Sequence, residues 1–191
     1  INLINGCINK DSQAQYRLYK LYSSKMYGLC LRYVKNKMDA NDLLQEGFIK
    51  VFENLHNFRN QGSLEGWIRK TFINTAINYC KQKYRLYESV NIDDYHEYID
   101  STNNNEYIDN IIEHSHYKAE ELLQIINNLP SHLSLVFNLY AIEGYSHKEI
   151  AEMLNIPVGT SKSHLHKARK LLQETILKIS KKNIIYEKEI R

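Results

Sequence analysis

Cationic side chains, hydroxyls and imidazoles recur along one side of the segment 160–173, which contains no acidic residue. On a helix, the outward positions are Lys162, Ser163, His166, Lys167, Arg169 and Lys170. Such groups suit contacts to the phosphates and base edges of a DNA major groove. The alternative is an ordinary amphipathic hairpin whose basic face is merely solvated. The one-sided charge favours a DNA-reading helix.

Two helices joined by a tight turn are expected to position these groups. Ser146 and Glu149 have the spacing of a capping box, so a short helix is predicted to begin at about Ser146. Asn155 and Pro157 end it, because Asn tolerates a left-handed cap and Pro disfavours helix in the residue before it. A second helix opens at 159–160, where a Thr hydroxyl is available as a cap. This pattern is typical of a helix-turn-helix.

A second set of polar groups lies on a predicted helix at 64–83. Its exposed side carries Arg69, Lys70, Asn74, Asn78, Lys81 and Lys83, with Trp67 at its start. Cations interleaved with amides and aromatic rings suit single-stranded nucleic acid, because bases stack on the rings while cations neutralise the backbone. The alternative is a solvated basic face, with Trp67 and Phe72 as core residues.

The remaining helical patterns supply a scaffold. Asp11 is predicted to cap one helix, and the apolar pattern at 26–33 to form a second helix packed on it. A third helix opens near Asp39, and its inward stripe is Leu44, Phe48, Val51 and Leu55. The polar face opposite carries Asp42, Gln45, Glu46 and Lys50. The helix dipole alone would account for Asp42. Helices at 122–129 and 133–140 would complete a four-helix C-terminal domain.

Composition narrows the class of protein. The 191 residues include seven Gly and two Pro, so long helices are expected and a turn-rich β fold is not. The chain has neither an apolar run of about eighteen residues nor a signal-peptide pattern, which predicts a cytoplasmic protein without membrane insertion. Cys7, Cys30 and Cys80 are expected to be free thiols. No P-loop, HExxH, nucleophile elbow or paired-Cys motif occurs, so no catalytic residue, metal site or cofactor is predicted.

The net charge of +3 hides a segregation along the chain. The segment 86–121 holds ten acidic residues and one base, whereas the rest of the chain holds 24 basic and 12 acidic residues. The run Ser-Thr-Asn-Asn-Asn at 101–105 favours turns. The alternative is a short docking helix formed by the neighbouring Tyr and Ile residues. We therefore predict an all-α protein with two small helical domains joined by an acidic flexible linker.

The order of these segments resembles the sigma factors of bacterial RNA polymerase, in the small extracytoplasmic-function (group IV) class of the sigma-70 family. The string DANDLLQEGFIKVFENL looks like the polymerase-binding helix of sigma domain 2, and GSLEGWIRKTFINTAINYCK looks like its promoter-melting helix. The string IPVGTSKSHLHKARKLL resembles the end of sigma domain 4. The resemblance implies sigma domain 2 at 1–85, the acidic linker at 86–120, sigma domain 4 at 121–178 and a basic tail, expected to be frayed, at 179–191.

The resemblance also implies roles for individual residues. Core polymerase contacts, on the coiled coil of the β′ subunit, would fall on Asp42, Gln45, Glu46 and Phe48. Contacts to the minus-ten element would fall on Asn60, Ser63, Trp67, Lys70, Asn74, Asn78 and Lys81. Contacts to the minus-thirty-five element would fall on Lys162, Ser163, His166 and Lys167, with Arg169 on phosphate. The chain departs from the family pattern at Asn78, where Asp is usual, and at Ser161 and His164, where an aliphatic residue and an Arg are usual.

The function that the resemblance implies is that of a non-enzymatic sigma factor. It would bind core RNA polymerase at the β′ coiled coil and the β flap, and direct recognition and opening of promoter DNA, both duplex and single-stranded. An anti-sigma factor is a further implied partner. The competing hypothesis is a stand-alone helix-turn-helix regulator that binds duplex DNA and does not touch the polymerase. The N-terminal body discriminates the two, because a regulator would need a ligand pocket or dimer seam there.

Overall fold

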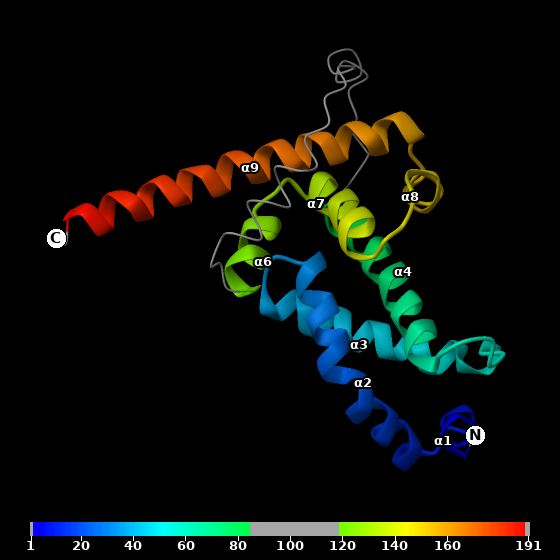
Figure 1. Cartoon of the computed structure of the whole chain (residues 1–191). Coiled ribbons are helices and arrows are strands. Elements are labelled where there is room, and N and C mark those ends of the chain that lie inside the picture. Colours follow the sequence, from blue (N-terminus) through cyan, green and yellow to red (C-terminus); the bar gives the residue numbers. More distant parts are fainter. Residues whose placement is uncertain (1, 85–118, 190–191) are drawn as a thin grey trace. The chain divides into compact units, whose positions relative to one another are not determined.

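The computed structural model describes residues 2–84 and 119–189 (Figure 1). Within these ranges the chain is helical and contains no strand, which confirms the all-α prediction. The described residues form two compact units, one before and one after the segment 85–118. Most of the predicted acidic linker therefore lies outside the described residues. Within the described ranges, no helix combines the length and apolar character that a membrane crossing requires.

The N-terminal unit is a bundle built around two helix pairs, α2 with α3 and α3 with α4. Its elements are α1 (Asn2–Ile8), α2 (Ser12–Tyr33), α3 (Lys37–Asn54), the 3-10 turn η1 (Leu55–Asn57) and α4 (Leu64–Tyr84). The predicted inward stripe of α3 is confirmed, since Leu44, Phe48, Val51 and Leu55 are all buried. The apolar face of α3 thus anchors α4, whose opposite side carries the predicted nucleic-acid groups.

Close packing of α3 against α4 depends on a glycine. A Cβ atom built on Gly47 would lie 2.3 Å from Cε1 of Phe72, and the Phe72 side chain is fully buried. The ring of Phe72 meets that of Phe48 edge-on, with centroids 5.3 Å apart. Because a packed interior transmits any displacement, a larger residue at position 47 would push the two helices apart.

Two helix boundaries in this unit differ from the prediction. Residues 12–33 form one continuous helix, α2, where two helices were predicted. The buried positions Leu18, Met26 and Leu29 continue at helical spacing across the polar run 23–25, so burial overrides the local signal for a break. Helix α3 begins before Asp39, because the side chain of Asn36 accepts a hydrogen bond from the Asp39 backbone N–H at 2.8 Å and is the N-cap.

All three cysteines are buried and none forms a disulfide, which confirms the prediction of free thiols. Burial raises the pKa of Cys30 and of Cys80 to about 12, so neither thiol ionises readily near neutral pH. The thiol of Cys80 donates to the backbone oxygen of Tyr33 at 3.3 Å. All three cysteines are core residues, and Cys80 joins α4 to α2 through this hydrogen bond.

In the described residues, the C-terminal unit is a helix-turn-helix supported by three further helical segments. Its elements are α6 (Ala119–Asn127), α7 (Ser131–Phe137), the π-helical η3 (Asn138–Ile142), α8 (His147–Leu154) and α9 (Val158–Glu189). Residues Ile125, Leu129 and Leu133 pack against three residues of α9, namely Ala168, Leu172 and Ile176. This aliphatic cluster fixes the buried side of α9 and so determines which of its residues face outward.

The predicted helix caps and boundaries of the helix-turn-helix are confirmed in part. Ser146 and Glu149 form the capping box, and Asn155 ends α8 in the left-handed conformation at φ 56°. Helix α9 starts at Val158, earlier than predicted, and Ser161 donates its N–H to the oxygen of Pro157 at 3.2 Å. The predicted cap at 159–160 is wrong, because Thr160 lies buried inside the first turn of α9. The same helix continues to Glu189, where a frayed tail was predicted.

Candidate nucleic-acid interface

The predicted minus-thirty-five residues all lie in the N-terminal part of α9. Lys162 and His166 are exposed, whereas Ser163, Lys167 and Arg169 are half-buried. The hydroxyl of Ser163 donates to the backbone oxygen of Thr160 at 3.0 Å, which leaves its oxygen free to accept from an exocyclic amino group of a base. Exposed cations beside half-buried polar groups suit a helix that presents one face to DNA in a fixed orientation.

Behind this face lies a contact network that the sequence analysis did not predict. The rings of Tyr140 and His147 stack with centroids 4.5 Å apart and planes at 24°. The guanidinium of Arg169 lies 5.7 Å from the centroid of the Tyr140 ring. A hydrogen bond of 2.9 Å joins Nδ1 of His147 to Oγ of Ser161, whose side chain is fully buried. The only sequence signal was that Ser161 stands where an aliphatic residue is usual.

The predicted minus-ten residues of α4 form a line along its exposed side. Lys70, Asn74 and Asn78 are exposed and lie four residues apart, and Lys81 is half-buried. A cavity of about 270 Å³ is lined by Asn74 and Asn78 together with Glu46 and Lys50 of α3. The structure therefore brings one predicted polymerase-binding residue, Glu46, to the same groove as two predicted minus-ten residues.

Trp67 is both a core and a surface residue. Its side chain is half-buried, and its ring centroid lies 5.8 Å from that of Phe58 at the start of the loop before α4. The sequence offered a stacking platform and a core residue as alternatives. The structure shows that the indole is partly a core residue, and its stacking on a base stays a prediction. One part of the indole is exposed to solvent, while the remainder packs against the loop.

Two residues of the loop between η1 and α4 have positive φ angles. Asn60 is exposed in the left-handed region at φ 54°, and Gly62 has φ 112°. The hydroxyl oxygen of Ser63 accepts the backbone N–H of Gly66 at 3.0 Å, so Ser63 caps the first turn of α4. Beyond the loop, Nζ of Lys25 on α2 lies 2.8 Å from Oε2 of Glu65. Asn60 and Ser63, both predicted to contact the minus-ten element, thus sit in an ordered loop.

The predicted polymerase-binding residues divide into two groups by exposure. Asp42, Gln45 and Glu46 are exposed on one side of α3. Phe48 is only 3% exposed, and its ring packs against that of Tyr19, with centroids 4.7 Å apart. In this structure Phe48 therefore supports the helix from within, whereas the three polar residues form the surface.

Lys83, expected on the exposed basic side of α4, forms an ion pair with Asp39 at the start of α3. It also lies 3.4 Å from the Tyr79 hydroxyl. The hydrogen bond to Asp39 raises the pKa of Lys83 above its ordinary value. Local sequence spacing could not predict this pair, because the two residues lie 44 positions apart. The pair ties the last turn of α4 to the bundle.

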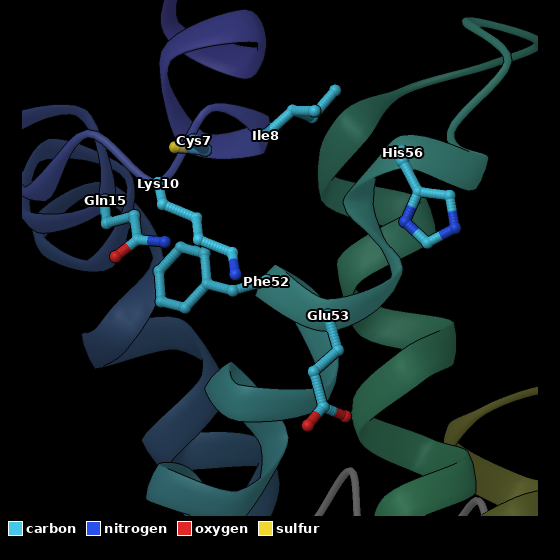
Figure 2. A pocket seen from close by; sticks show the side chains of 7 residues that line it. All are labelled: Cys7, Ile8, Lys10, Gln15, Phe52, Glu53 and His56. Atoms are coloured by element: carbon cyan, nitrogen blue, oxygen red, sulfur yellow. The ribbon is translucent and has the colours of Figure 1, made fainter.

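A cavity of about 490 Å³ opens beside α1, and none of the residues predicted to bind nucleic acid is among those that line it (Figure 2). Its lining comes from α1, the turn after it, α2, α3 and η1: Cys7, Ile8, Lys10, Gln15, Phe52, Glu53 and His56. Burial, with a smaller effect of Asp11, raises the pKa of the Cys7 thiol. The thiol is thereby disfavoured as a nucleophile.

Comparison with known proteins identifies the class of this architecture. The family model "Sigma-70 region 2" matches residues 18–86, and the model "Sigma-70, region 4" matches residues 119–172. The chain belongs to the sigma-70 family.

Curated relatives narrow the group. The ECF RNA polymerase sigma-E factor of Haemophilus influenzae is 30% identical over 175 residues, which cover 87% of this chain and 89% of the relative. The sigma-E factor of Escherichia coli K12 is 31% identical over 175 residues, covering 88% of this chain and 90% of the relative. This chain is therefore an ECF sigma factor, a transcription initiation factor that binds core RNA polymerase and directs promoter recognition, as the resemblance implied.

A solved structure shares the fold. It is the sigma factor RpoE of Bartonella quintana in complex with the anti-sigma factor NepR, with a TM-score of 0.50 and 18% sequence identity. The match covers 86% of this chain and 96% of that one.

Proposed function

We propose that the two units divide promoter recognition between parted and paired strands. The N-terminal unit, with the loop 58–63 and the exposed side of α4, captures the non-template strand of the minus-ten element. The C-terminal unit reads the minus-thirty-five element with α9. The observation that carries this proposal is the contrast between the two surfaces. One combines cations with amides and a half-exposed indole, while the other combines cations with a hydroxyl and an imidazole.

The minus-ten surface has the groups that unpaired bases require. Lys70 and Lys81 neutralise the strand backbone, while Asn74 and Asn78 offer amides to base edges along the same side of α4. Trp67 at the start of the helix offers a face on which a base stacks. Asn60 and Ser63 in the adjacent loop contact a flipped base, whose unstacking costs a few kcal/mol, on the order of 3, that such contacts offset.

The minus-thirty-five surface suits duplex DNA. Lys162, His166 and Lys167 face the base edges of the major groove, together with Ser163. Arg169 contacts phosphate and fixes the register of α9 on the duplex.

Core polymerase binding falls to both units. Asp42, Gln45 and Glu46 on α3 contact the coiled coil of the β′ subunit, with Phe48 holding α3 from beneath. The C-terminal unit contacts the β flap. The chain acts in the cytoplasm with the polymerase, and an anti-sigma protein controls it, since its structural relative was solved with one.

The test is a pull-down with core RNA polymerase of the source organism, followed by run-off transcription and permanganate footprinting. The wild type should bind core enzyme, initiate at one position and open the minus-ten region. Replacing Asp42 and Glu46 by Ala should abolish capture of core enzyme while leaving duplex binding by α9 intact. Unchanged core binding in that variant would contradict the role of α3.

A further inference from the structure

The contact network behind the recognition surface joins three elements of the C-terminal unit. Tyr140 belongs to η3, His147 to the first turn of α8, and Ser161 and Arg169 to α9. His147 has two partners, the ring of Tyr140 at 4.5 Å and the Ser161 hydroxyl at 2.9 Å. A single imidazole thus connects the supporting helix, the first helix of the helix-turn-helix and the recognition helix.

The hydrogen bond to Ser161 satisfies a buried polar group. The Ser161 side chain has no exposed surface, and a buried hydroxyl left without a partner is destabilising. Ser161 immediately precedes Lys162 and lies two residues before Ser163, both predicted to contact bases. The orientation of the first turn of α9 therefore depends on the position of His147.

The ring of Tyr140 connects His147 to a later turn of α9, because it also contacts Arg169. It is half-buried, stacks on His147 and lies beneath the guanidinium of Arg169 at 5.7 Å. Stacked rings and a cation over a ring hold side chains in defined orientations at little cost in freedom. These two contacts hold Arg169 in a defined orientation, whereas Lys162 and His166 are exposed.

We propose that His147 and Tyr140 are positioning residues for reading of the minus-thirty-five element, with Ser161 as the point at which His147 sets the recognition helix. This inference rests on the proposed role of α9 and deepens it. Neither residue faces DNA in the proposed arrangement; each acts through residues of α9. The residue type at 161 then determines whether α9 is aligned by a hydrogen bond or by apolar contact alone.

Burial and nearby positive charge both favour the neutral form of His147. The groups that act on it from α9 are Lys162 and Arg169, and from η3 it faces the ring of Tyr140. Burial, followed by the two cations, lowers the pKa of His147 below its ordinary value of 6.5. A protonated imidazole would add a positive charge directly behind two cations that the DNA surface uses.

Phe and Ala variants separate the two contacts of His147. His147→Phe keeps a ring for Tyr140 and removes the hydrogen bond, and His147→Ala removes both. Ser161→Ala removes the bond from the other side without leaving a buried hydroxyl unpaired. The probe is a duplex selected from a randomised library by wild-type holoenzyme, compared with its scrambled counterpart. Thermal unfolding of each full-length variant is followed in parallel, and affinities are compared well below the unfolding temperature.

His147→Phe should weaken binding to the selected duplex by about 3- to 10-fold and leave binding to the scrambled duplex unchanged. Adding Ser161→Ala to His147→Phe should recover part of the loss, since the unpaired hydroxyl is then gone. His147→Ala and Tyr140→Leu should reduce the preference for the selected duplex further. Equal losses on both duplexes, or no loss in a folded His147→Phe chain, would overturn the positioning role while leaving the proposed function standing. A wild type that fails to prefer its selected duplex would overturn both.

Discussion

The helices that we propose to contact nucleic acid, α4 and α9, are held in different ways in the two units. In the N-terminal unit, α4 is fixed by a close apolar contact at Gly47 and Phe72, and its outer residues Lys70, Asn74 and Asn78 are exposed. In the C-terminal unit, three of the five predicted DNA contacts are half-buried, and Arg169 lies over an aromatic ring. The difference is consistent with the proposed target of each helix. A parted strand is flexible and adapts to a line of exposed amides and cations, whereas a duplex is stiff and demands fixed side chains.

The largest effect should come from Gly47→Ala, which is expected to destabilise the N-terminal unit and to leave the C-terminal unit unchanged. The new methyl group would clash with the fully buried ring of Phe72. We expect the N-terminal unit to lose about 2–3 kcal/mol, even after the gain in helix propensity. Core binding and strand opening should fall, while binding of the selected duplex by α9 stays unchanged.

Gly28→Ala is the matched control, because a Cβ atom at that position of α2 has no neighbour within 4 Å. It should be neutral or stabilise α2 by about 0.5–1 kcal/mol. Chemical unfolding of both variants measures the difference. Equal stabilities of the two variants would refute the packing role assigned to Gly47.

Trp67→Ala should remove a stacking surface of the minus-ten site. Loss of one stacked base costs about 2 kcal/mol, so strand opening should fall more than tenfold in permanganate footprints. Because the indole also packs on Phe58, a Phe58→Ala variant serves as the control for lost packing. If Phe58→Ala impairs opening as much as Trp67→Ala does, the indole acts only through packing.

Lys167→Ala and His166→Ala should affect the C-terminal unit alone, by weakening the contact of α9 with duplex DNA. Each should weaken the selected duplex by about 1 kcal/mol through loss of a base contact, with little change in minus-ten opening once the complex has formed. Lys148→Ala is the control, since Lys148 is an exposed cation of the neighbouring helix α8. A loss of equal size on scrambled duplexes would assign both residues to phosphate.

The smallest effect concerns pH and only the C-terminal unit. The pKa of His147 is lowered in the folded chain, so folding favours the neutral imidazole. Its contribution to stability is fully present above pH 6.5 and is lost as the pH falls through the lowered folded value. The unfolding temperature of the wild type should therefore drop more steeply below pH 6.5 than that of His147→Phe. Parallel slopes would show that the imidazole binds protons equally in the folded and unfolded chains, so that folding does not lower its pKa.

The features that the sequence predicted well were local ones. The capping box at Ser146 and the left-handed Asn155 lie within a few residues of their partners, so their spacing alone specified them. The continuity of α2 was missed because Ser and Lys at 23–25 suggest a break, and only burial of the flanking Met26 shows otherwise.

Features that join distant residues were not accessible from the sequence. The pair Lys83 with Asp39 spans 44 positions, and His147 with Ser161 spans 14. The sequence also left the exposure of a helical residue uncertain where that residue was assigned both to the core and to a binding surface. Phe48 was predicted both as part of an inward stripe and as a polymerase contact, and the packing of Tyr19 and Phe72 around its ring explains why it is buried.

The division between parted and paired strands is tested most directly by run-off transcription from a promoter whose minus-ten region is already unpaired by mismatches. On this template, Trp67→Ala holoenzyme should recover to nearly the wild-type level, because opening is no longer required. Lys167→Ala holoenzyme should remain impaired, because its duplex contact is unaffected by the mismatches. Equal recovery of both variants, or recovery of Lys167→Ala alone, would contradict the account.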